Sequence, residues 1–296
     1  GQSAVWGITQ SIQEAVNYAS DGSTLNIYAG EYEEQVIVKE KRLNLIGIEG
    51  RDSTIIKTPD DPGILSLDQI KAMYPAPLTQ SRQQYEQKEQ LQKEQLQNER
   101  LQNEQLRPQD LAANVSPDHQ RHKVKVSNFL NQVTRDSEDA GIYMALIIVN
   151  YESQLPVTVQ GLTVTGLAIL GADGSIIQDN CFKDNQFAGA YLGWVDAVWN
   201  EDGTRIIEPV LIRNNIFTQN NDALFIGGLY EYDDSSYNVS VEENEFIGNE
   251  CCGLYAFNAN GLILTGNHFK DNKYNGAYLY DTDNWSQYDA YEQAAG

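Results

Sequence analysis

The sequence has few basic side chains and lacks any long apolar run. Of its 296 residues, 20 are Lys or Arg and 42 are Asp or Glu, so the formal charge is 42 − 20 = 22 negative. Phosphate groups would repel a chain this acidic, which argues against nucleic acid and anionic membranes as partners. No run of 18 apolar residues occurs, so the sequence predicts no transmembrane helix.

Cysteine and histidine are also scarce. Three cysteines are far fewer than a disulfide-built scaffold needs, and three scattered histidines do not indicate a zinc site. The adjacent Cys251 and Cys252 leave two interpretations open, which are a pair of small apolar fillers and a strained vicinal bridge. No glycine-rich phosphate loop is present, so nothing supports nucleotide chemistry.

One short pattern occurs four times in the C-terminal half. Each copy has an Asn, a Phe two residues later and a second Asn three residues after that. The first asparagines are Asn180, Asn215, Asn244 and Asn267, and the second are Asn185, Asn220, Asn249 and Asn272. The first asparagines are spaced by 35, 29 and 23 residues, so the last spacing is the bare unit and the others carry insertions of 12 and 6.

The repeat predicts a parallel β-helix. Its short alternating apolar runs, such as residues 262–264 and 277–279, are typical of strands of about three to five residues. Asn suits the turns because it tolerates left-handed backbone and its amide can bond to the neighbouring coil. Such coils stack into parallel sheets with about 4.8 Å between strands. Beyond the motif, the spacing aligns Gly189, Leu224, Gly253 and Gly276, and then Tyr191, Ile226, Tyr255 and Tyr278.

These repeats resemble the right-handed parallel β-helix proteins of the pectin lyase-like superfamily. In addition, residues 11–17, 27–34 and 43–47 are similar to the opening of pectin methylesterases, where this stretch forms a capping helix and the first coils. The resemblance implies an all-β fold, a single-stranded right-handed parallel β-helix with an N-terminal capping helix. It does not specify a reaction, because the fold hosts many activities and the catalytic motifs of its methylesterases, polygalacturonases and alginate epimerases are missing from this chain.

A low-complexity segment interrupts the strand pattern. Residues 86–110 repeat a five-residue unit rich in Gln and Glu, whose leucines would spiral around a helix instead of forming one stripe. We therefore expect a helical or disordered insertion. The predicted organisation is a cap with the first coils at 1–67, the insertion at 68–140, the remaining coils at 141–280 and a C-terminal tail at 281–296.

Two insertions between coils carry the side chains of chemical interest. They follow Leu192 and Gly227 at the same phase of the coil, so both loops are expected on one side. Aromatic faces bind sugar rings while carboxylates and amides bond to hydroxyls, which predicts a carbohydrate groove. The predicted substrate-binding residues are Trp194, Trp199, Tyr230, Tyr232, Tyr237 and Trp285. The simpler interpretation, that such residues are common in any surface loop, stays open.

Catalysis is a further hypothesis, and a polysaccharide lyase or glycoside hydrolase is the class it suggests. A glycosidase needs two carboxylates roughly 5 to 9.5 Å apart, which stacked coils offer at Asp196 and Glu231. Asp222 is a third catalytic candidate, with a turn cap as its alternative role. Calcium is the one cofactor suggested, with solvated acidic turns as the alternative. Its candidate ligands are Asp233, Asp234, Asp281 and Asp283.

The sequence as a whole predicts an extracytoplasmic domain that binds or processes polysaccharide through an acidic, aromatic loop face. The location (extracellular, cell-surface or periplasmic) follows from the family resemblance, since the chain opens without a signal-peptide pattern. A non-catalytic structural or adhesive β-helix is the alternative function. The sequence does not define the oligomeric state.

Overall fold

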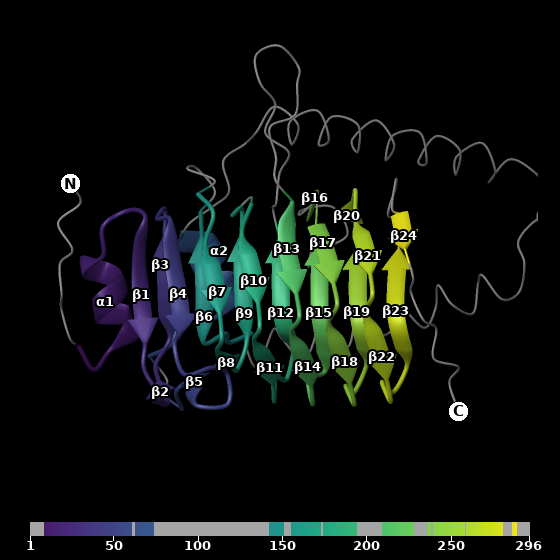
Figure 1. The fold of residues 1–296 in the computed structure, drawn as a ribbon, viewed down its shortest axis with the longest axis horizontal. Coiled ribbons are helices and arrows are strands. Elements are labelled where there is room, and N and C mark those ends of the chain that lie inside the picture. Colours follow the sequence, from purple (N-terminus) through teal and green to yellow (C-terminus); the bar gives the residue numbers. More distant parts are fainter. Residues whose placement is uncertain are drawn as a thin grey trace, which may run out of the picture. The chain divides into compact units, whose positions relative to one another are not determined.

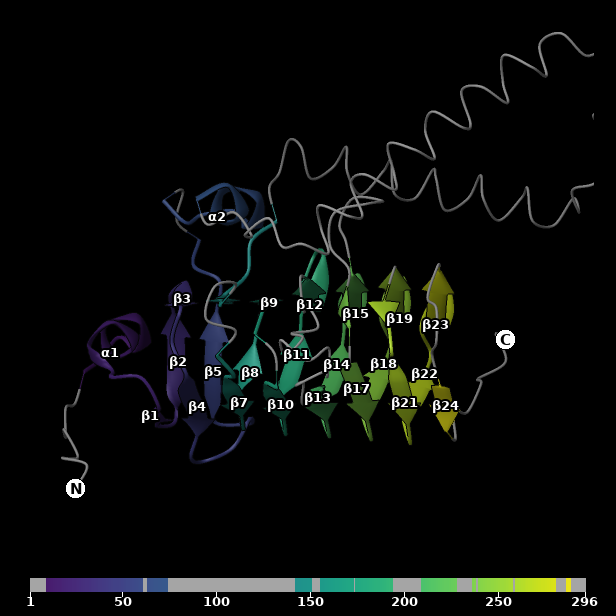
Figure 2. The same ribbon diagram turned by 90° about the horizontal axis from the view of Figure 1, so that it is seen from above.

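The computed structural model describes residues 9–60, 63–73, 142–150, 155–172, 174–193, 209–227, 236–237, 239–257, 259–280 and 286–288. Within these ranges strands predominate, and the helices are α1 (Ile12–Tyr18) and α2 (Leu67–Met73). The strands form three large parallel sheets, A, B and C. Figures 1 and 2 show the strands of each sheet side by side, in sequence order from purple to yellow.

Within each sheet, the strands pair in the order of the sequence. Sheet A contains β1 (Ser23–Ile27), β4 (Leu43–Gly47), β7 (Thr158–Gln160), β10 (Ile176–Gln178), β13 (Val210–Arg213), β17 (Val239–Glu242), β21 (Ile263–Thr265) and β24 (Ser286–Tyr288). Sheet B contains β2 (Gly30–Glu33), β5 (Thr54–Lys57), β8 (Thr163–Val164), β11 (Cys181–Lys183), β14 (Ile216–Thr218), β18 (Glu245–Ile247) and β22 (His268–Lys270). Sheet C contains β3 (Val36–Lys39), β6 (Leu146–Val149), β9 (Leu167–Leu170), β12 (Ala188–Gly193), β15 (Asp222–Gly227), β19 (Cys252–Phe257) and β23 (Asn275–Tyr280).

The chain visits the sheets in the same order in every coil. It passes from A to B to C, as in β1, β2 and β3, and then returns to A with β4, which pairs with β1. Each strand therefore lies beside its equivalent from the next coil, which is the arrangement that the repeats predict. A fourth, two-stranded parallel sheet joins β16 (Ser236–Tyr237) to β20 (Ala259–Asn260).

The core of the last coils is built around a ladder of stacked phenylalanines. Phe182, Phe217, Phe246 and Phe269 occupy the same register position of sheet B. Their ring centroids are 4.9, 4.9 and 4.8 Å apart, which matches the spacing between parallel strands. All four rings are buried among the aliphatic side chains of sheets A and C. The strand spacing itself therefore imposes ring stacking on every coil that carries this Phe.

Two ladders of asparagine side chains run beside the phenylalanines. Asn244 shows the pattern, since its Oδ1 accepts from the backbone N–H and the Nδ2 of Asn215, at 3.0 Å each. Its own Nδ2 donates to the carbonyl of Ile212 at 2.8 Å and to Oδ1 of Asn267 at 3.0 Å. The second asparagines bond in the same way, for example Asn220 to Asn249. The predicted bonding of the amides between coils is thus confirmed.

The predicted backbone conformation of these asparagines is wrong. The left-handed φ belongs to the residue before each ladder asparagine, as at Asp179 (φ 59°) and Glu243 (φ 54°). The same holds at all eight ladder positions, where the preceding residues are Asp179, Asp184, Asn214, Gln219, Glu243, Gly248, Gly266 and Asp271. The asparagine itself is selected because its amide must reach the neighbouring coil, and the residue before it makes the bend.

The first coil is closed by the predicted capping helix. Ser11 is the N-cap of α1, and its Oγ accepts from the N–H of Glu14. The carboxylate of Glu34 accepts from the N–H groups of Ile12 and Gln13, at 2.6 and 2.9 Å. A carboxylate placed there satisfies free N–H groups of the first helical turn and complements the helix dipole. Ile12 and Val16 then cover the apolar end of the coils.

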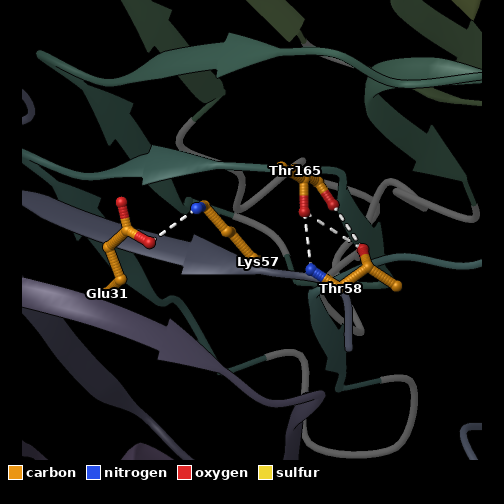
Figure 3. A network of polar contacts seen from close by, with 4 residues as sticks. All are labelled: Glu31, Lys57, Thr58 and Thr165. Carbon is orange, nitrogen blue, oxygen red and sulfur yellow. Dashed lines mark hydrogen bonds and ion pairs between the residues drawn. The ribbon is translucent and has the colours of Figure 1, made fainter. Parts of the chain in front are cut away.

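The long insertion of the sequence lies between strands β5 and β6 of the β-helix. Beside its start, the N–H of Thr58 donates to Oγ1 of Thr165 at 2.6 Å, and the Thr58 hydroxyl donates to the Thr165 carbonyl at 2.9 Å (Figure 3). On the adjacent surface, Lys57 pairs with Glu31 at 2.6 Å. α2 overlaps the first residues of the predicted 68–140 insertion. Residues 74–141 lie outside the described ranges, so the helical or disordered spacer stays a prediction.

Candidate functional site

The two predicted loop insertions begin at neighbouring positions of sheet C. β12 ends at Gly193 and β15 at Gly227, and the register pairs the preceding residues, Leu192 and Ile226. The chain therefore leaves the sheet at the same turn in both coils, which confirms the common phase. At the same turn of the next coil, β20 pairs with β16 and sets Tyr237 beside Asn260.

An aromatic column follows the outer face of sheet C next to this turn. The alternate residues of these strands belong to the core, so Tyr191, Phe225, Tyr255 and Tyr278 face away from it. Successive ring centroids lie 5.7, 4.9 and 5.3 Å apart. The first three rings are only 0, 4 and 3% exposed, so this outer face is covered. Burial raises the pKa of Tyr255, whose buried hydroxyl has no hydrogen-bond partner among the described residues.

One part of the predicted register is wrong. The sequence spacing aligns Ile226 with Tyr191, whereas the structure pairs Phe225 with that tyrosine. The turn before sheet C is one residue shorter in this coil, because β15 starts two residues after Asn220 and β12 starts three residues after Asn185. Counting from the first Asn thus overshoots by one. The aromatic side chain of Phe225 is the sequence feature that could have indicated the correct pairing with Tyr191.

The same shift bears on the predicted pair of carboxylates. Gly193 and Gly227 are equivalent, so the residue level with Asp196 in sequence count is Tyr230 and no longer Glu231. Both loops lie outside the described residues, and the pairing of these carboxylates stays a prediction.

Most of the other predicted site residues also lie outside the described ranges. These are Trp194, Trp199, Tyr230, Tyr232 and Trp285 for substrate, and Asp233, Asp234, Asp281 and Asp283 for calcium. For Tyr237 the structure describes the strand pairing alone. The sugar and calcium roles of these residues therefore stay predictions.

Asp222 is the catalytic candidate that the structure describes. It begins β15 and is 1% exposed, and its Oδ1 accepts from the N–H of Cys252 at 3.3 Å. Burial raises the pKa of Asp222 to about 6, although hydrogen bonds from the Cys251 thiol and the Cys252 N–H oppose this shift. A carboxyl group this deeply buried does not contact a polymer on the surface. Its observed role is to bridge two coils.

Asp222 lies in a cluster with two thiols. The Sγ atoms of Cys251 and Cys252 are 3.4 Å apart, and both cysteines are free and buried. A carboxylate oxygen and both sulfur atoms lie within 4.8 Å of one another. Within the described ranges, this cluster brings together side chains able to hold a metal ion.

A shallow depression of about 560 Å³ lies at a different turn, between sheets A and B. Glu49, Arg51, Asp52 and Gln160 contribute to its polar lining. The Nη1 of Arg51 donates to the carbonyls of Asn180 and Asn214, at 3.2 Å each, so this side chain ties neighbouring coils together. The Arg51 guanidinium therefore has a structural role in this depression.

The comparison with protein families agrees with this architecture. Residues 147–292, which are 146 of the 296, match the model described as right handed beta helix region. Together with the three parallel sheets, this match makes the molecule a right-handed parallel β-helix protein. No curated protein and no solved structure matches the chain.

The structure also bears on the membrane prediction. Neither of the described helices has the length and apolar character needed to cross a bilayer.

Proposed function

We propose that this β-helix is an extracytoplasmic polysaccharide-binding domain whose ligand lies against the turn between sheets C and A. The observation that carries the proposal is the shared point of departure at Gly193 and Gly227. It tethers two loops rich in aromatic and acidic residues at adjacent positions of a rigid sheet. Loops held by a rigid scaffold are frequent sites of ligand binding.

The sheet beneath this turn supports the same proposal. The aromatic column of Tyr191, Phe225, Tyr255 and Tyr278 lies next to this turn with one ring per coil, and its first three rings are covered, so the column supports the turn from within instead of contacting a ligand. The β16–β20 pairing adds Tyr237 and Asn260 at the same turn. A polymer aligned with the stacking direction of the coils would meet the two loops in successive coils, which suits a chain of repeated sugar units.

Binding is better supported than cleavage. Asp222 is buried and bonded to the neighbouring coil, so the described part of the chain presents no pair of carboxylates to a substrate at this turn. A glycosidase needs both groups beside the scissile bond. We therefore propose polysaccharide binding as the function, and lyase or hydrolase activity stays a hypothesis to be assayed once binding is found.

A glycan array tests the proposal. The purified domain is screened with and without calcium, alongside the variants Trp194→Ala and Trp199→Ala. We expect binding to one glycan class, lost or weakened at least tenfold in the tryptophan variants because a stacking face is removed. The matched control is Tyr28→Ala, which removes an aromatic side chain that is 61% exposed at the turn between sheets A and B. This control should bind normally.

The array also separates the alternative function. A well-folded sample that binds neither neutral nor acidic glycans would contradict the proposal and favour a structural or adhesive β-helix. Equal loss in Tyr28→Ala and the tryptophan variants would place the ligand away from the proposed turn. For any glycan that binds, the melting temperature should rise with its concentration, since a ligand of the folded state stabilises that state.

A further inference from the structure

Asp222, Cys251 and Cys252 form a compact group of potential metal ligands where β15 and β19 begin. Asp222 is the first residue of β15 and Cys252 the first of β19, with Cys251 directly before it. The two Sγ atoms are 3.4 Å apart, and both lie within 4.8 Å of a carboxylate oxygen of Asp222. The three residues are 1, 4 and 3% exposed.

The β-helix itself holds these side chains in place. The N–H of Cys251 donates to the carbonyl of Asn221 at 2.8 Å, and the carbonyl of Cys251 accepts from the N–H of Tyr274 at 3.0 Å. The N–H of Cys252 donates to Asp222. Each ligand residue is thus fixed by hydrogen bonds to a neighbouring coil. Ligands carried by regular strands are positioned more accurately than ligands on loops.

The donor set suits a thiophilic ion. Two thiolates and one carboxylate are ligands that Zn²⁺ prefers, with Zn–S distances of about 2.3 Å and Zn–O distances of about 2.0–2.2 Å. Tetrahedral Zn²⁺ places two sulfur ligands about 3.8 Å apart at these bond lengths. The observed 3.4 Å needs only a small side-chain rotation to reach this separation.

The carboxylate also lacks a cation of its own in the described part of the chain. The ion pairs there join Lys57 to Glu31, Lys270 to Asp271 and Lys273 to Glu250. None of them involves Asp222, whose hydrogen bonds come from Cys252 N–H and the Cys251 thiol. A buried carboxylate is costly unless it is paired or binds a metal. A bound divalent cation would remove this cost.

We propose that Asp222, Cys251 and Cys252 form a binding site for one Zn²⁺ ion. Access to the site is from Asn275, the first residue of β23, which is exposed and pairs with Cys252. Its Nδ2 lies 3.9 Å from the Cys252 Sγ, and exchange of the amide N and O positions turns the oxygen toward the site. The fourth ligand of a tetrahedral Zn²⁺ ion would then be the amide oxygen of Asn275 or a water molecule.

Binding is a ligand exchange without electron transfer. Two S–H bonds break, two Zn–S bonds form, and the two thiol protons pass to the solvent, so affinity should rise with pH. Both cysteines must be in the reduced state. A disulfide between them would consume both sulfur ligands.

Cobalt(II) is the spectroscopic probe for this site. The whole chain, reduced with a phosphine and freed of metal, is titrated with Co²⁺ and then with Zn²⁺. We expect one Co²⁺ per chain with a near-ultraviolet sulfur-to-cobalt charge-transfer band, which one equivalent of Zn²⁺ removes. Cys251→Ser and Cys252→Ser should each lose the band, and Asp222→Asn should bind at least tenfold more weakly. Cys181→Ser, which changes the cysteine of β11, should keep both band and affinity.

Absence of the band in the reduced wild-type chain would overturn the proposal. So would a band that survives in both cysteine variants, or one that is also lost in Cys181→Ser. A second measurement covers the case in which the cysteine variants do not fold. In the wild type, Cys251 and Cys252 are buried and react only when the fold opens locally, so Zn²⁺ should slow their alkylation and leave the rate at Cys181 unchanged. Alkylation rates of Cys251 and Cys252 that are the same with and without Zn²⁺ would exclude the site.

Discussion

The first coils and the last four coils reach the same architecture by different means. In the first coils, the core positions are aliphatic, as at Val36, Leu45 and Ile56, and the contacts between coils are individual ones. Examples are the Glu34 helix cap and the Thr58–Thr165 pair. In the last four coils, the same Phe and Asn side chains recur in ladders. A parallel β-helix therefore needs coil spacing and an apolar interior, and ladders are one way to set the register.

The largest expected effect comes from the phenylalanine ladder. Phe217→Ala removes a buried ring stacked on Phe182 and Phe246, at 4.9 Å on both sides. Truncation of a buried Phe leaves a cavity and costs about 3–5 kcal/mol of the free energy of unfolding. Urea denaturation measures this loss, with Phe217→Leu as the matched control because it keeps most of the volume. Equal stability of Phe217→Ala and wild type would show that the ladder can collapse around the gap.

The asparagine ladder should give the next largest effect. Asn244→Ala removes the acceptor for the N–H of Asn215 and the donor to the carbonyl of Ile212, both buried. Unpaired buried groups cost about 1–3 kcal/mol each, so we expect a loss of roughly 2–4 kcal/mol in urea denaturation. The control from the first coils is Asn44→Ala, whose Nδ2 bonds to Thr24 at the surface. If Asn44→Ala lost as much stability as Asn244→Ala, a ladder asparagine would contribute no more than an individual surface contact.

Asp222 should add a pH dependence to the stability of the coils that carry the ladders. Its pKa is raised to about 6 in the folded chain from an ordinary 3.8. Between these values the folded state holds a proton that the unfolded state has lost, so stability falls as the pH rises from about 4 to about 6. Two pKa units correspond to roughly 3 kcal/mol. Asp222→Asn removes this dependence and keeps an acceptor for the Cys252 N–H.

The measurement is the free energy of unfolding of metal-free, reduced wild type minus that of Asp222→Asn, at pH 4, 5, 6 and 7. The difference cancels the titration of other carboxylates. As the pH rises to about 6, the wild type should lose stability relative to Asp222→Asn. Above about pH 6 the difference between the two proteins should stay constant. Cys251, Cys252 and Tyr255 are the other titratable groups that interact with this carboxylate. The hydrogen bond with Cys252, together with burial, raises the pKa of Cys251, and burial raises the pKa of Tyr255, so both stay above this range. A difference independent of pH would contradict the raised pKa.

Repetition explains which features the sequence predicts. The repeated Asn-x-Phe-x-x-Asn places identical residues at identical positions, so the sheets, the stacked coils and the bonding of the amides all follow from it. The shared departure point of the two loops follows from counting along the same repeat. The capping helix is predicted by its apolar spacing and by family resemblance. The structure adds Glu34, whose role as a helix cap depends on a contact between residues more than 20 positions apart.

The features that sequence reasoning missed are those that break the repeat or cross between coils. The turn before Phe225 is one residue short, and a single deletion is invisible when only the first asparagines are counted. The Asn-Asn-Asp context of Asp222 is typical of a turn and gives no sign that this carboxylate is buried. Its burial comes with Cys251 and Cys252, about 30 residues later in the chain. No local pattern contains that information.

The smallest expected effect lies among the individual contacts of the first coils. Thr165→Val removes the hydroxyl that accepts from the N–H of Thr58 at 2.6 Å and keeps the side-chain shape. The carbonyl of Thr165 still accepts from the Thr58 hydroxyl, whereas the Thr58 N–H loses its acceptor and the 3.1 Å contact between the two hydroxyls is lost with it (Figure 3). A net loss of about 1 kcal/mol is expected in urea denaturation. This is well below the value for Asn244→Ala, because only one donor is left without its partner.

Lys57→Ala is the matched control for this last prediction. It removes a neighbouring contact of similar length, the ion pair with Glu31, but both side chains are exposed to water. Water and salt screen such a pair, so its loss should be smaller than that of Thr165→Val and should vanish at high salt. If Lys57→Ala were the more damaging change, exposed charges rather than hydrogen bonds between coils would hold the first coils in register. If both changes were silent, the aliphatic interior alone would suffice there, and the contrast with the ladders would be complete.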